Sequence, residues 1–171
     1  NYFEVYNNIG VAYTSWKKFD KAIDSFDKAI QINPLYAEAY NNKGNALKEK
    51  GQHWLAVECY NESINLEPNY TDAITNLGII WDLLNDFTKS ERYFRQALKQ
   101  DPRNTSTLYN LANCLFNAEH YNKTIDVCEK IIAINPFFYH AYNRIGLCYI
   151  QLESEETASD FFENSVKIKP D

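Results

Sequence analysis

Residues 3–36 read FEVYNNIGVAYTSWKKFDKAIDSFDKAIQINPLY and carry two apolar stripes at helical spacing. Within each stripe the apolar residues recur at intervals of three and four, which is the period of one face of an α-helix. The stripes consist of Tyr6, Ile9, Gly10 and Tyr13, and of Ala22, Phe26, Ala29 and Ile30. The polar residues 15–18 between them predict a turn. The stretch therefore predicts a hairpin of two antiparallel helices, A and B.

This pattern recurs along the whole chain with a period of 34 residues. The period is marked by prolines, which end a helix because they lack a donor and clash with the preceding turn. The prolines are Pro34, Pro68, Pro102, Pro136 and Pro170. Small residues that let helices A and B approach closely keep the same spacing, and we expect Gly44 to pack on helix B near Ala56. Stacking such hairpins buries both stripes, so the sequence predicts an all-α solenoid.

The repeated Gly/Ala, aromatic and Pro positions resemble the tetratricopeptide repeat, whose period is also 34 residues. The resemblance implies a right-handed α-solenoid of five helical hairpins, in which the A helices line the concave face. We expect a single array over residues 1–171, with repeats at about 3–36, 37–70, 71–104, 105–138 and 139–171. The fourth repeat departs most from the pattern, with Ala112, Thr124 and Cys128 at conserved-type positions. The chain contains no Met, and we interpret it as part of a longer protein.

Composition excludes several classes of function. The formal net charge is -6 and no cluster of Lys and Arg is present, so we expect no binding to nucleic acid. No apolar run approaches the roughly 20 residues of a membrane helix, so we expect no membrane insertion. The four cysteines form no CxxC pair, which favours free thiols in a reducing, cytoplasmic location. No phosphate loop, nucleophile motif or ligand-spaced His pair occurs, so we expect no enzyme, cofactor or metal site.

One polar column stands out on helix A, two residues before the small site of each repeat. It consists of Asn8, Asn42, Asn76, Asn110 and Arg144. A side-chain amide offers one acceptor and two donors, so a row of them can hold an extended peptide backbone. The column resembles the asparagine ladder of the tetratricopeptide superhelix of O-GlcNAc transferase. The alternative is that a chain with 20 asparagines repeats one by duplication, without any binding role.

Further candidates lie beside this column and are predicted to contact the same ligand. They are Asn41, Asn45, Asn113, Tyr109, Glu38, Asp72 and His140. The acids give the early repeats an acidic groove, although acids at helix starts also serve the helix dipole. The carboxylate-clamp pattern of these repeats, which grips chaperone tails, is matched only by Asn110 and Arg144, so we do not favour it.

The pattern as a whole favours a protein–protein interaction scaffold that binds an extended polypeptide segment. A first alternative is the substrate-recruiting arm of a larger enzyme such as a glycosyltransferase. A second is a self-assembling module, because the last B helix is predicted to expose Ala158, Phe161, Phe162 and Val166 at an uncapped C-terminal repeat. The ladder asparagines are expected to be solvent-exposed in the absence of ligand.

Overall fold

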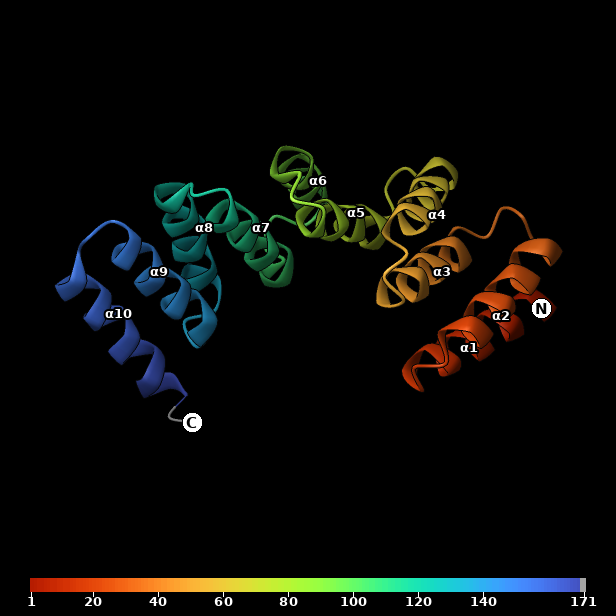
Figure 1. Cartoon of the computed structure of the whole chain (residues 1–171), viewed down its shortest axis with the longest axis horizontal. Helices are drawn as coiled ribbons and strands as arrows, with labels where there is room; N and C mark the ends of the chain where they lie inside the picture. Colours follow the sequence, from red (N-terminus) through yellow and green to blue (C-terminus); the bar gives the residue numbers. More distant parts are fainter. Residues whose placement is uncertain (170–171) are drawn as a thin grey trace. The chain divides into compact units, whose positions relative to one another are not determined.

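A computed structural model describes residues 1–169, and within them the chain is helical with short turns and no strand. Figure 1 shows ten helices in that part of the chain. Their bounds are α1 Tyr2–Ser15, α2 Phe19–Ile32, α3 Ala37–Glu49, α4 His53–Leu66, α5 Thr71–Leu83, α6 Phe87–Gln100, α7 Thr105–Asn117, α8 Tyr121–Ile134, α9 Tyr139–Gln151 and α10 Glu155–Ile168. Odd-numbered helices are the predicted A helices and even-numbered helices the B helices. The all-α prediction is confirmed.

The chain divides into two compact units, Asn1–Leu84 and Asn85–Asp171, which are described separately. In unit 1, α1 packs on α2 and α3 on α4, and α2 and α4 also contact the A helix that follows each of them. In unit 2, α7 packs on α8 and α9 on α10, with α6 against α7 and α8 against α9. Within each unit every interior helix thus has neighbours on two sides, as a stack of hairpins requires. A single array over residues 1–171 stays a prediction.

Helix ends follow the repeat. Each of the first four B helices ends two residues before its proline, for example α2 at Ile32 before Pro34. The A–B turns contain one residue with positive φ, which is Gly51 at +79° in the second hairpin and Glu119 at +61° in the fourth. Glycine adopts this conformation without the steric cost that other residues pay. The fifth proline, Pro170, lies outside the described residues.

The glycines of the A helices make room for aromatic rings. A methyl group added to Gly44 would lie 2.6 Å from Cε1 of Tyr60, and one added to Gly10 would lie 2.5 Å from Cε1 of Phe26. Tyr60 and Phe26 are themselves fully buried. Gly44 therefore faces the ring of Tyr60, which corrects the expected contact near Ala56. An aromatic ring needs the whole space that the missing side chain leaves, and an alanine opposite would not fill it.

Candidate functional site

The ladder column is only partly open to solvent. Asn8 is exposed on α1, whereas Asn42 on α3 and Asn76 on α5 are half-buried in unit 1. In unit 2, Asn110 on α7 and Arg144 on α9 are also half-buried. The expectation that the ladder amides stand free in solvent is therefore wrong for Asn42 and Asn76, and the reason lies in their hydrogen bonds.

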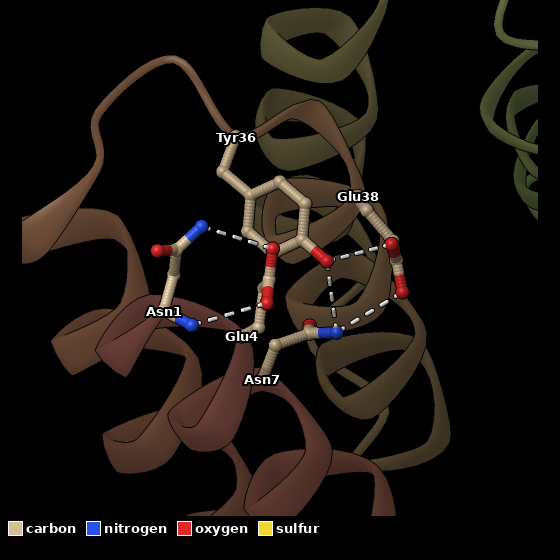
Figure 2. A network of polar contacts seen from close by, with 5 residues as sticks. All are labelled: Asn1, Glu4, Asn7, Tyr36 and Glu38. Carbon is tan, nitrogen blue, oxygen red and sulfur yellow. Dashed lines mark hydrogen bonds and ion pairs between the residues drawn. The ribbon is translucent and has the colours of Figure 1, made fainter.

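A polar network joins α1 to the start of α3 in unit 1 (Figure 2). Its centre is Asn7, which is 1% exposed and whose Nδ2 donates to Oε1 of Glu38 at 3.0 Å. The hydroxyl of Tyr36 donates to the other oxygen of Glu38 at 2.7 Å. Burial and the neighbouring Glu38 carboxylate raise the pKa of Tyr36 above its ordinary value, which keeps the phenol a donor. Asn42 completes the network, because its Nδ2 donates to Oδ1 of Asn7 at 3.1 Å.

The same arrangement recurs one repeat later. Nδ2 of Asn76 donates to Oδ1 of Asn41 at 2.9 Å, and Asn41 is 4% exposed. Tyr70 stands where Tyr36 stood, and its pKa is raised to about 12 by burial and by the charges of Glu38 and Asp72. Asn41, predicted as a ligand contact, is therefore a buried structural residue like Asn7. Its side chain is enclosed because the next A helix covers this side of α3.

These bonds fix how the ladder amides point. Asn42 and Asn76 each commit the amide nitrogen to the preceding repeat, at 3.1 and 2.9 Å. Hydrogen-bond networks of this kind assign the oxygen and nitrogen of an amide side chain. What Asn76 leaves available is its carbonyl oxygen, and Asn42 engages its own oxygen only through a long 3.4 Å contact from Asn41. In unit 1 the ladder therefore offers acceptors, which suit the N–H groups of a peptide backbone.

Unit 2 fills the equivalent positions with aromatic rings and a cation. The ring of Tyr109 contacts Phe138 edge-on at 5.4 Å and His140 at 5.6 Å between centroids. The guanidinium of Arg144 lies 4.7 Å from the ring centroid of Phe116 and 6.0 Å from that of Tyr109. Within the described residues Arg144 forms no ion pair with a carboxylate, so its charge is held by π contacts alone. Such a guanidinium is oriented and weakly hydrated, which suits recognition of a carboxylate.

Asn45 and Asn113 occupy matching positions in the second and fourth repeats. Oδ1 of Asn45 accepts from the hydroxyl of buried Tyr60 at 2.9 Å, so this amide serves the hairpin interior. In the fourth repeat Cys128 replaces Tyr60 and brings no hydroxyl. Oδ1 of Asn113 is consequently buried without a hydrogen-bond partner among the described residues. Asn113 thus keeps an unsatisfied acceptor beside the face that carries Tyr109 and Arg144.

Three other predicted site residues, Glu38, Asp72 and His140, are exposed at the starts of their A helices. The sequence analysis missed the buried asparagine Asn7 and the aromatic residues that lie across from it. A signal was present, since an aromatic column with the period of the repeat runs through Tyr2, Tyr36, Tyr70 and Phe138. In the structure this column lies beside the ladder and supports it.

Other sites find less support in the part of the chain that the structure describes. No group of three or more His, Cys, Asp or Glu side chains is placed to hold a metal ion in residues 1–169. All four cysteines are free, and burial raises the pKa of Cys59 and of Cys148 to about 11. Among the described residues, no helix combines the length and the apolar character needed to cross a bilayer.

Relatives of known sequence share only part of this chain. Tetratricopeptide repeat protein 17 of Homo sapiens is 28% identical over 95 residues, which is 54% of this chain. The protein of the same name from Rattus norvegicus matches to the same extent. The matched region spans only 8% of the length of these curated relatives.

Solved structures and family models match nearly the whole chain. The crystal structure of MamA aligns with a TM-score of 0.86 and 22% identity over 95% of both chains. That of YrrB, described as a TPR protein with an unusual peptide-binding site, aligns with a TM-score of 0.80 and 20% identity, over 97% of this chain and 86% of that one. Models of the tetratricopeptide repeat match residues 3–36, 37–70, 83–145 and 139–171. The chain therefore belongs to the tetratricopeptide repeat family.

Proposed function

We propose that this chain is a protein–protein interaction scaffold whose A-helix faces bind an extended polypeptide segment. The observation that carries the proposal is the oriented ladder of unit 1, in which Asn42 and Asn76 turn their amide nitrogens inward. Their oxygens, with exposed Asn8, form a row of acceptors on successive A helices. The description of YrrB as a TPR protein with a peptide-binding site supports the same use of the fold.

The contact residues of this proposal divide by chemistry. In unit 1 the ladder is flanked by the exposed carboxylates of Glu38 and Asp72, which favour a ligand segment with Lys or Arg. In unit 2, Arg144 and the exposed His140 lie beside Tyr109 and favour a segment with Asp, Glu or an aromatic residue. Asn110 and Asn113 complete the contact set of unit 2, and Asn45 lies at the edge of that of unit 1. Asn41 is left out of the set because it is buried.

A matched pair of variants tests the proposal. Peptides selected from a randomised library on the parent chain serve as ligands, and their affinities are measured by fluorescence anisotropy. Asn8→Ala with Asn110→Ala removes one ladder amide from each unit, and neither amide has a hydrogen bond within the described residues. Asn61→Ala with Asn122→Ala removes two exposed amides from the B helices and is the control.

We expect the ladder variant to lose about 1–3 kcal/mol of binding free energy, from two hydrogen bonds of about 0.5–1.5 kcal/mol each. The loss should be similar for peptides of different sequence, because the bonds go to the backbone. The control should bind like the parent. Equal affinity of both variants would show that the ladder does not hold the ligand, and the proposal would fail.

A further inference from the structure

The outer face of α1 is apolar and uncovered, although the same repeat positions are buried elsewhere. Val5 is 53% exposed and Ile9 is 38% exposed. The residues that match Val5 in the next two repeats, Ala39 and Ala73, are fully buried. The residue that matches Ile9 in the third repeat, Leu77, is also fully buried. In unit 1 each later A helix is covered by the B helix before it, and α1 has no such cover within residues 1–169.

The outer face of α10 is the complementary surface. Val166 is 58% exposed, whereas the matching Ile30 and Ile132 are half-buried. Phe162 is half-exposed, although its counterparts in the other repeats are buried. Those counterparts are Phe26, Tyr60, Phe94 and Cys128. Ala158, by contrast, is fully buried and does not contribute to this face as expected, because α9 covers it.

The contact of α2 with α3 shows how a B helix meets the next A helix. Phe26 and Ala22 of α2 pack with Ala46 of α3 in one buried cluster. At the rim, Nζ of Lys43 lies 2.6 Å from Oδ1 of Asp27. This contact therefore combines an apolar centre with an ion pair at defined repeat positions.

A second ion pair joins the far end of the same contact. Lys50 of α3 pairs with Asp20 of α2, beside the A–B turn of the first hairpin. The two ion pairs fix the register of one hairpin on the next, because they join fixed positions of the repeat.

We propose that the outer face of α10 packs on the outer face of α1 of a second copy, in the register of the α2–α3 contact. In that register Phe162 covers Ala12, as Phe26 covers Ala46. Glu163 takes the place of Asp27 and faces Ile9, which takes the place of Lys43. The occupant is a second copy because α10 carries the repeat positions that already bind an A helix inside each unit.

Charge at the ends of the helices agrees with this pairing. Glu156 takes the place of Asp20 and comes next to the turn that holds Lys17 and Lys18. Neither lysine forms an ion pair within the described residues. The contact joins two different surfaces, so it is heterologous and each copy can bind one partner at each end. The weight-average mass should therefore rise with concentration without stopping at two copies, unless a ring closes.

Sedimentation equilibrium of the 171-residue chain over a concentration series tests the proposal. Ile9→Glu places an unpaired charge in the contact next to Glu163 and should weaken association at least about tenfold. Leu83→Glu, which alters another exposed apolar residue of unit 1, is the control and should associate like the parent. A chain that stays monomeric at every concentration would overturn the proposal, and the two faces would then serve another segment or partner.

The register is tested by charge. Ile9→Lys recreates at the contact the Lys43–Asp27 pair, with Glu163 as the acid, and should associate at least as tightly as the parent. Adding Glu163→Lys to Ile9→Glu should restore association. If Ile9→Lys and Ile9→Glu weaken association equally, the register is wrong.

Mixing separates this contact from a symmetric one. The Ile9→Glu chain keeps its α10 face, and a Val166→Glu chain keeps its α1 face. Each alone should remain monomeric, and together they should form a one-to-one complex. Self-association of the Val166→Glu chain alone would show that α1 pairs with α1, which would overturn the proposal. Thermal melts of each variant at low concentration confirm that the substitutions leave the fold intact.

Discussion

Replacing Asn7 by Ala should destabilise unit 1, whereas replacing its neighbour Asn8 by Ala should not. Both asparagines lie in the middle of α1, so the gain in helix propensity from Ala is the same for both. Asn7 is buried and bonded to Glu38 and Asn42, while Asn8 is exposed. The pair of variants therefore isolates the network from the helix.

The magnitude follows from the bonds. The bond from Asn7 to the charged Glu38, at 3.0 Å, contributes about 1.5–3 kcal/mol, and the bond from Asn42 about 0.5–1.5 kcal/mol. Ala returns up to about 0.7 kcal/mol through helix propensity. Water replaces part of the lost bond to Glu38, since this carboxylate is exposed. The net cost of Asn7→Ala is about 1–3 kcal/mol, and Asn8→Ala stays within about 0.5 kcal/mol.

Thermal and urea unfolding followed by far-ultraviolet circular dichroism measures both variants. Each kcal/mol corresponds to about 2–4 °C in the melting temperature of a chain of this size. A double-mutant cycle of Asn7→Ala with Asn42→Ala should show a coupling energy of about 0.5–3 kcal/mol, because the two side chains are bonded. If Asn7→Ala and Asn8→Ala melt at the same temperature, the network does not hold the repeats together and our reading of it is wrong.

Three further predictions concern packing and titration. Gly44→Ala should lower the free energy of unfolding by about 1–2 kcal/mol, measured by urea unfolding, because the new methyl group overlaps the immobile Tyr60 ring by more than the helix propensity of Ala offsets. At pH 8, alkylation of native Cys59 should be about a hundredfold slower than that of a free thiol, since burial raises its pKa from 9.0 to about 11 and leaves less thiolate. Above pH 10 the stability should fall, because unfolded tyrosine ionises at 10.0 while folded Tyr70 holds its proton to about 12, and Tyr70→Phe should lessen the loss between these values.

The fold was predictable because its signals are local and repeated. Each proline and each small residue marks a helix end or a close contact within one hairpin, and five phased copies of the pattern leave little freedom. The helix bounds accordingly follow the period of 34 residues, with α1 and α3 starting 35 residues apart at Tyr2 and Ala37. The predicted polar turns also fall between the helices of each hairpin.

The site was harder to predict because its contacts join different repeats. Neighbouring residues of a helix are about 100° apart, so composition alone does not say whether Asn7 or Asn8 faces the next hairpin. That depends on Tyr36 and Glu38, which lie about one repeat further along. The acids interpreted as groove charges bind the network as well, so one residue serves both structure and recognition. In the same way, the orphan oxygen of Asn113 depends on a missing hydroxyl at Cys128.

The two units fill one repeat position with different chemistry, and this decides what each can recognise. In unit 1, Asn42 is tied to Asn7 and Glu38, so its orientation, its contribution to folding and its ability to accept a backbone N–H are coupled. In unit 2, Arg144 is held by ring contacts with Phe116 and Tyr109, which leave its hydrogen-bonding edge uncommitted to any carboxylate among the described residues. Substitution of a ladder residue in unit 1 therefore changes stability and binding together. Substitution of Arg144 by a neutral residue changes mainly the charge offered to a ligand, and so reports the chemistry of that ligand more directly.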